Sequence, residues 1–181
     1  MKSPIIKGER VVLRPIKLAD AQNYVRWFSD GEVMRYFHYA MYKITLKKEQ
    51  KWIREQWRKQ DAVNWVVEVN GKHIGGTGIT LHKKEKTGTW GIILGDKSEW
   101  GKGFAVEVIN LCADYYFKKF NGERFELIVE MGNEKALKAY KKAGFKFEGA
   151  KRSCGYNPLL KKRIDIGFMS ILREEWLKKN K

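Results

Sequence analysis

The chain has 181 residues, which suits one domain over 1–181 that buries roughly two thirds of its unfolded surface. It opens without the long apolar stretch of a secretion signal, and no later segment approaches the ~20 apolar residues of a membrane span. We therefore expect a cytoplasmic protein with no membrane partner. Cys112 and Cys154 lie in different predicted elements and fit a reducing compartment, and the three histidines lack metal-site spacing, so we predict no metal.

The formal net charge is +16, from 37 Lys and Arg against 21 Asp and Glu. Such a charge is compatible with a nucleic-acid surface, a ribosomal or acidic partner, or a solvated lysine-rich exterior. The basic residues form scattered pairs and no single tail. Solvated faces are therefore the default interpretation, and nucleic acid is not expected as a substrate.

The first half of the chain predicts a strand over 9–14, helices over 20–28 and 45–60, and strands over 64–69 and 72–81. Pro15 ends the first strand because it lacks a backbone donor, and Thr45 is a plausible N-cap. Asn70-Gly71 is a strong hairpin signal, since both residues tolerate positive φ. Glycines in the second arm suggest a bulge or a bend. The aromatic-rich segment 31–43 either lines a substrate slot or packs as a loop on its own core.

The second half predicts strands over 90–94, 125–129, 147–152 and 164–171, and helices over 104–120, 133–143 and 173–179. Asn121-Gly122 and Gly144 end the two longer helices. The strand, helix and strand over 125–152 favour a right-handed parallel unit. No internal repeat or linker interrupts the pattern.

The stretch from Trp90 to Ala105 reads as strand, glycine loop and helix. Gly101 and Gly103 permit a sharp turn and leave backbone N–H groups free to point at an anion at the positive end of the helix. The hydroxyl residue of a P-loop and the third glycine of a dinucleotide fingerprint are both missing. The physical proposal is a pyrophosphate cradle.

This loop, Trp100-Gly101-Lys102-Gly103-Phe104-Ala105, resembles the acetyl-CoA site of the GNAT superfamily of N-acetyltransferases, in the branch that includes the ribosomal-protein-alanine and spermidine acetyltransferases. Ser98 stands where that motif usually has Arg or Gln, which removes one cation or amide. A second block over 127–145, with an Asn after a strand, a Tyr seven residues later and a closing Gly-Phe, resembles the next block of the same superfamily. The resemblance covers most of the chain.

The resemblance implies an α/β (α+β) fold with a mixed, mostly antiparallel sheet, a central splayed pair of parallel strands and flanking helices. It implies acetyl-CoA as acyl donor, with a pantetheine arm that pairs with the free edge of one splayed strand. The Leu94 N–H is the candidate oxyanion donor. The cofactor-binding residues implied by the match are Ile92, Ile93, Leu94, Trp100, Gly101, Lys102, Gly103, Phe104, Ala105, Asn133 and Tyr140.

Tyr140 matches the superfamily's usual general acid, which protonates the departing CoA thiolate. A core aromatic is the competing interpretation, because Ala136 and Tyr140 share a helix face. The general base is open. Ile128 stands where the ribosomal-protein branch has a glutamate, and Glu126 and Glu130, on the same strand face, are the candidates, although each could be a solvated strand-end glutamate.

The resemblance predicts an N-acetyltransferase that uses direct attack by a primary amine in a ternary complex. A protein N-terminal amine is placed first as acceptor, because a polycation would sit poorly in a basic protein unless the cleft is locally acidic. Polyamine, antibiotic and amino-sugar acceptors stay open, as does a homodimer. The rival from another class is a non-catalytic, nucleic-acid-associated binding module.

Overall fold

The computed structural model describes residues 3–37 and 44–179, and in that part of the chain one mixed sheet of eight strands runs through the molecule. In spatial order the strands are β1 (Ile6–Lys7), β2 (Val11–Pro15), β3 (Ala62–Val69), β4 (Lys72–His82), β5 (Thr87–Leu94), β6 (Arg124–Glu130), β8 (Lys162–Leu172) and β7 (Lys146–Asn157). The helices are α1 (Ala21–Phe28), α2 (Leu46–Arg58), α3 (Phe104–Phe120), α4 (Glu134–Ala143) and α5 (Arg173–Lys179), with short 3-10 helices η1 (Leu18–Asp20) and η2 (Lys97–Glu99).

The predicted fold class is confirmed. Among the strand pairs of the described residues, only β5 and β6 run parallel, and every other pair is antiparallel. The parallel pair lies in the interior of the sheet, with five strands on the β5 side and three on the β6 side. The sheet is therefore mostly antiparallel with a central parallel pair, as the resemblance implied.

The first strand begins later than predicted. Residues 9–10 form a bend, and pairing with β3 starts at Val11. Val11 and Leu13 are fully buried on one face of β2, so the hydrophobic alternation begins only there. Pro15 closes the strand as expected. The N-cap prediction for α2 is confirmed, because the Thr45 hydroxyl accepts a hydrogen bond from Lys48 N at 3.3 Å.

The hairpin between β3 and β4 is confirmed. Asn70 and Gly71 have φ of 50° and 75° and form its turn. A register shift follows: Val67 pairs with Gly75 while the next residue pairs with His73, which leaves Ile74 as the extra residue of a bulge in β4. The carbonyl of this residue accepts hydrogen bonds from the two N–H groups that follow β5, so the bulge holds the end of β5 in place.

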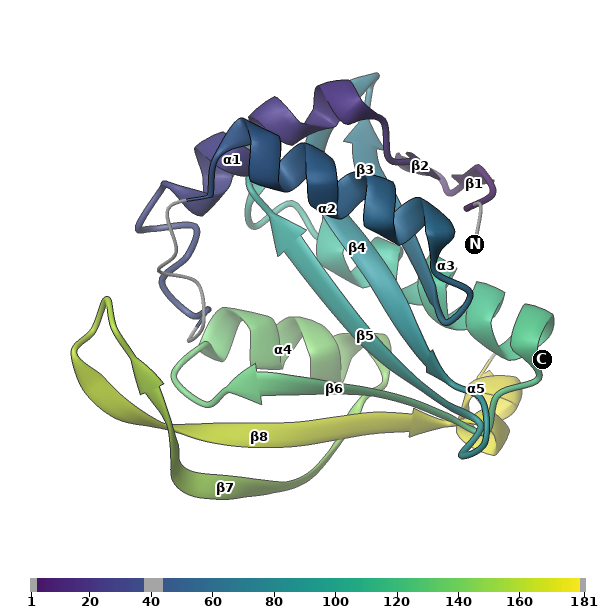
Figure 1. Cartoon of the computed structure of the whole chain (residues 1–181). Helices are drawn as coiled ribbons and strands as arrows, with labels where there is room; N and C mark the ends of the chain where they lie inside the picture. The colour runs from purple at the N-terminus through teal and green to yellow at the C-terminus, as the bar shows by residue number, and fades with distance from the viewer. Residues whose placement is uncertain (1–2, 38–43, 180–181) are drawn as a thin grey trace.

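Helices cover both faces of the sheet (Figure 1). On one face α1 and α2 pack over β3 and β4 around Trp27, Ile53 and Val66, all buried. On the other face α3 packs through buried side chains that include Ile109 and Tyr116, with α4 beside it. Burial on both faces explains why β3 is a nearly continuous hydrophobic run, interrupted only by Asn64 and Glu68.

The crossover through α3 builds the parallel pair, since β5, α3 and β6 follow one another in the chain. The predicted parallel unit over 125–152 needs a correction. β6 and β7 do run the same way, because each is antiparallel to β8, but β8 lies between them and they do not pair. The last strand of the sequence thus enters between two strands that precede it.

Candidate active site

The pairing between β5 and β6 stops early and leaves a gap. Only Thr87 to Thr89 of β5 pair with β6, opposite Arg124 to Glu126. Beyond that point β5 pairs with β4 alone, while β6 stays paired with β8 to its end. Figure 1 shows the two strands close together near α5 and far apart at their other ends. One edge of β5, from Trp90 to Leu94, is therefore unpaired.

The peptide groups that face this gap follow from the hydrogen bonds on the other side of β5. Thr77 Oγ1 of β4 donates to the carbonyl of Gly91, and the Gly95 N–H donates to the β4 carbonyl of residue 74, both at 2.9 Å. Successive residues of a strand present their N–H and C=O groups to alternate edges. Ile92 and Leu94 therefore face the gap, whereas the backbone of Ile93, counted among the cofactor contacts by resemblance, faces β4.

The glycine loop has the geometry of an anion cradle. Gly101 and Gly103 have φ of 77° and 85°, a region that other residues rarely adopt, and Gly103 is the N-cap of α3. Within the described residues, the five backbone N–H groups from Gly101 to Ala105 donate to no acceptor. They stand at the positive end of a 17-residue helix, so they can bind a diphosphate.

Two loop residues predicted to contact the cofactor use their polar groups within the chain. The Trp100 indole N–H donates to the carbonyl of Leu94 at 2.7 Å, and its backbone N–H donates to the carbonyl of Lys97 at 3.2 Å. Trp100 thereby fixes the loop to the end of β5. It uses the carbonyl of Leu94, and the N–H of Leu94 still faces the gap. The Lys102 ammonium lies 2.9 Å from Glu99 and is half exposed.

Sequence reasoning missed Arg10 at this loop. Its Nη1 donates to the carbonyl of Lys102 at 3.0 Å, and its Nε lies 3.1 Å from Glu107 of α3. A Cβ placed on Gly103 would lie 3.7 Å from Arg10 Nη2, so this guanidinium borders the amide cluster. The pairing joins residues 97 positions apart, and no local pattern in the sequence marks it.

Tyr140 lies on α4 at the point where the strands separate. Its ring meets the Trp90 ring edge to face at 5.8 Å, and it also contacts Phe145 at 6.0 Å. In the described part of the chain no hydrogen bond uses its hydroxyl. Burial raises the pKa of Tyr140 to about 12, so the phenol keeps its proton at neutral pH and has one to give.

Asn133 caps the same helix. Its side-chain oxygen accepts from the N–H of Ala136 at 3.2 Å, which fixes the orientation of the carboxamide. Neither hydrogen of its amide nitrogen is used within residues 3–37 and 44–179. The N-cap role thus leaves a donor available for a ligand beside Tyr140.

The structure separates the two candidate glutamates. Glu126 pairs with Thr89 at the closed end of the gap, and its carboxylate lies 2.6 Å from Arg124 Nε. Glu130 lies at the open end of β6 and is 5% exposed, so it is not the solvated residue that the sequence also allowed. No Lys or Arg of the described residues pairs with it. Ile128, on the same face, is 44% exposed.

Sequence reasoning also missed the residues around Glu130. Asn157, fully buried at the end of β7, donates to Glu130 Oε2 at 2.9 Å and to the carbonyl of Arg35 at 2.7 Å. These bonds bring the segment after α1 to the end of β6. In that segment Met34 is buried and residues 36–37 are half-buried, whereas positions 38–43 of the predicted aromatic slot lie outside the described residues.

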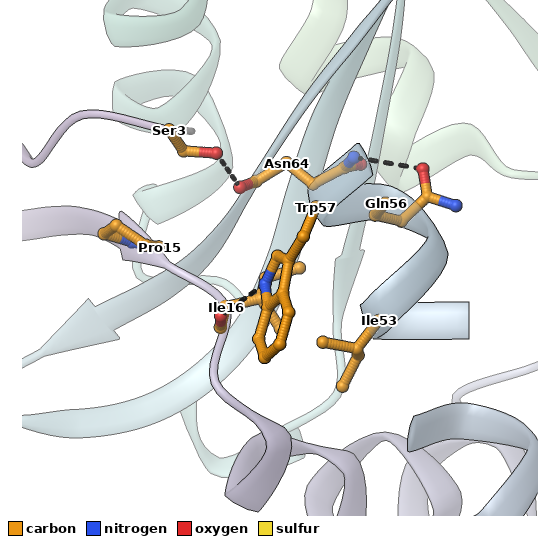
Figure 2. Close-up of a pocket in the computed structure, with 7 residues that line it drawn as sticks. All are labelled: Ser3, Pro15, Ile16, Ile53, Gln56, Trp57 and Asn64. Carbon is orange, nitrogen blue, oxygen red and sulfur yellow. Dashed lines mark hydrogen bonds between the residues drawn. The ribbon is translucent and has the colours of Figure 1, made fainter. Parts of the chain in front are cut away.

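A pocket of about 420 Å³ lies away from the gap, between α2 and the strands β2 and β3. Figure 2 shows Trp57 between Ile16 and Ile53, with the indole N–H donating to the carbonyl of Ile16 at 3.1 Å. Asn64 and Gln56 form a further hydrogen bond at 3.4 Å. Its lining belongs to the opposite side of β4 from the gap, so it contributes no group to the site.

No cluster of three or more His, Cys, Asp or Glu side chains suited to a metal ion occurs in the described ranges. None of the helices described is both long enough and apolar enough to cross a membrane.

A gap between parallel strands, beside a helix whose first amides are unused within the described residues, has the shape and the backbone donors that an acyl thioester on a diphosphate-linked arm requires. Residues 10–146 match the family model described as "Acetyltransferase (GNAT) domain". The chain therefore belongs to the GNAT family, and it is an N-acetyltransferase that uses acetyl-CoA.

Named relatives agree with this family. The chain is 28% identical to "Uncharacterized N-acetyltransferase p20" of Bacillus licheniformis over 93% of this chain and 96% of that protein. It is 29% identical to the spermidine N(1)-acetyltransferase of Escherichia coli (strain K12) over 77% of this chain and 74% of that protein. The crystal structure of Vibrio cholerae spermidine N-acetyltransferase with CoA and spermine has the same fold, with a TM-score of 0.85, 23% identity and coverage of 94% and 99%.

Proposed function

We propose that the chain transfers the acetyl group of acetyl-CoA to a primary amine of a polyamine, by direct attack within a ternary complex. The observation that carries the site is the run of five unused amides from Gly101 to Ala105 immediately beyond the unpaired edge of β5. These amides bind the diphosphate of the donor, and Arg10 adds positive charge beside them. The pantetheine arm lies along the gap, where Ile92 and Leu94 offer backbone groups and Asn133 offers its amide.

The chemical steps use three further groups: the Leu94 N–H, the Tyr140 phenol and the Glu130 carboxylate. The amine nitrogen attacks the thioester carbonyl carbon, and the Leu94 N–H stabilises the oxygen on which negative charge develops. The carbon–sulfur bond then breaks, and Tyr140 gives its proton to the departing thiolate. The proton of the amine passes to Glu130, directly or through water. Tyr140 suits the acid role because its phenol is protonated at neutral pH and its hydroxyl has no hydrogen-bond partner among the described residues, so it is free to donate to the sulfur.

Two observations favour a polyamine as the acceptor. The named relatives include spermidine acetyltransferases, and the protein N-terminal amine that the sequence placed first finds no support among them. A polycation also requires local negative charge in a chain of net charge +16. Glu130 supplies it, because its buried carboxylate is hydrogen-bonded to a neutral amide and to no cation of the described residues. Such a carboxylate can bind an ammonium group.

The experiment is release of free thiol from acetyl-CoA, with mass spectrometry of the product amine. The acceptors are spermidine, an alanine-terminated peptide, an aminoglycoside and glucosamine. We expect the highest kcat/KM with spermidine. For this acceptor Glu130→Gln lowers kcat/KM by at least about ten-fold, because a hydrogen bond to a charged group is lost. The exposed Glu85→Gln serves as the control. Faster turnover of another acceptor, or an unchanged Glu130→Gln, would overturn the assignment.

A further inference from the structure

Asn157 has all of its side-chain hydrogen-bonding groups engaged with three separate segments. Its amide nitrogen donates to Glu130 at the end of β6 and to the carbonyl of Arg35 after α1. Its oxygen accepts from the N–H groups of Leu159 and Leu160 in the turn before β8, at 3.1 and 3.0 Å. Since backbone N–H groups can only donate, the oxygen must face the turn and the nitrogen must face Glu130.

This arrangement holds one oxygen of Glu130 and leaves the other unused. Oε2 accepts from Asn157, whereas Oε1 has no hydrogen-bond partner among the described residues. A Cβ placed on Gly132 would lie 3.6 Å from Oε1 and 3.8 Å from the Tyr36 ring. The unused oxygen and the Tyr36 ring therefore both lie close to Gly132, between the end of β6 and the segment after α1.

We infer that Asn157 is a positioning residue: it orients Glu130 through Oε2 so that Oε1 can receive the ammonium group of the acceptor. This inference rests on the proposed function. A neutral amide is suited to the task, because it fixes the carboxylate without cancelling its charge. A Lys or Arg at the same place would hold Glu130 equally well but would compensate its charge, and the acceptor would lose its counter-ion.

The same carboxamide also links Glu130 to the backbone of Arg35. The segment after α1 and the end of β6 therefore share one anchor, although residues 35 and 157 are 122 positions apart. Displacement of Asn157 would change both the orientation of the carboxylate and the wall formed by residues 36–37. The expected effect is on acceptor affinity and not on the donor, whose contacts lie on β5, α3 and α4.

The test uses Asn157→Asp, which keeps an oxygen for the turn amides and replaces the nitrogen that donates to Glu130 and to the Arg35 carbonyl by a second carboxylate oxygen. We expect kcat/KM for spermidine to fall at least about ten-fold, mainly through KM, with the KM of acetyl-CoA within about two-fold of the wild type. A residue that only supports the fold would lower the amount of folded enzyme. It would then reduce kcat and leave both KM values unchanged.

The double variant Glu130→Gln with Asn157→Asp keeps the test falsifiable if the single variant is poorly folded. The introduced glutamine can donate to the introduced aspartate, so we expect the urea midpoint to return part of the way toward the wild type, since the bond to the Arg35 carbonyl stays lost. The KM of spermidine stays high, because the carboxylate has moved from β6 to β7. Asn64→Asp, which makes the same chemical change at the distant contact with Gln56, is the matched control for acceptor kinetics.

The outcomes distinguish a failure of the role proposed for Glu130 from a failure of the positioning role inferred for Asn157. If Glu130→Gln leaves spermidine kinetics unchanged, the proposed function of Glu130 fails. If Glu130→Gln raises the KM of spermidine while folded Asn157→Asp does not, the proposed function stands and the positioning role of Asn157 is overturned. Recovery of wild-type kinetics by the double variant would also overturn it.

Discussion

Tyr140 meets Trp90 edge to face, with ring centroids 5.8 Å apart and ring planes at 86°. Trp90 is the first residue of β5 beyond the last pair with β6, so this contact places the phenol beside the point where the two strands separate. The sequence allowed a packing role or an acid role for Tyr140. The geometry is compatible with both at once, since the ring packs against Trp90 while the hydroxyl makes no hydrogen bond to any residue in 3–37 or 44–179.

Replacement of Tyr140 by Phe should separate these roles, because it keeps the ring and removes the proton. We expect kcat to fall by about a hundred-fold or more, the low end of what a positioned general acid contributes, with the Kd of CoA nearly unchanged. Steady-state kinetics and calorimetry are the measurements. Tyr115→Phe on α3, whose ring packs against Trp65, is the control. An unchanged kcat would remove Tyr140 from the mechanism.

The glycine loop should tolerate no branched side chain. At Gly103, φ is 85°, so Gly103→Val strains the backbone and places a side chain among the amides that bind the diphosphate. We expect the affinity for CoA to fall at least about ten-fold in calorimetry. Gly71→Val introduces similar strain at a φ of 75° in the distant hairpin turn and should leave the affinity unchanged. Wild-type affinity in Gly103→Val would count against this cradle.

A third prediction concerns stability and pH. Glu49 is 5% exposed on the buried face of α2, its carboxylate makes no hydrogen bond or ion pair with the described residues, and burial raises its pKa from 4.5 to about 7. The folded state therefore binds this proton more tightly than the unfolded state does. Between pH 4.5 and 7 the contribution of Glu49 to the free energy of unfolding falls as pH rises, and above pH 7 it is constant.

Urea unfolding at pH 5 and pH 8 tests this sign. Relative to the wild type, Glu49→Gln should gain stability on going from pH 5 to pH 8, because it removes the carboxylate that must be buried at high pH. Glu55→Gln, on the exposed side of the same helix, should show no such gain. Equal pH dependence in wild type and Glu49→Gln would show that Glu49 ionises normally in the folded protein.

Local chemistry made much of the fold predictable. Asn70 and Gly71 specify a turn by their own backbone preferences, and Thr45 and Gly103 mark helix starts. The periodicity of each segment then identifies the elements between them. What could not be predicted is the strand order, because the insertion of β8 between β6 and β7 depends on pairing between distant segments.

In the candidate site, too, features set by local sequence could be predicted and features set by distant contacts could not. The loop and Tyr140 could be predicted because each lies in a block of neighbouring residues that resembles a motif of the superfamily. Arg10 and Asn157 were missed because they reach the site only through contacts across 97 and 27 or more positions. The choice between Glu126 and Glu130 likewise required the register of β5 against β6, which places one at the closed end and the other at the open end.

The central claim is that the donor occupies the gap, with its diphosphate on the loop amides. Hydrogen–deuterium exchange with and without CoA measures this directly. We predict slower exchange on CoA binding at the amides of Ile92, Leu94 and residues 101–105, with little change around the pocket beside Trp57. Calorimetric binding of CoA without protection of these amides, or with protection centred on that pocket, would contradict it.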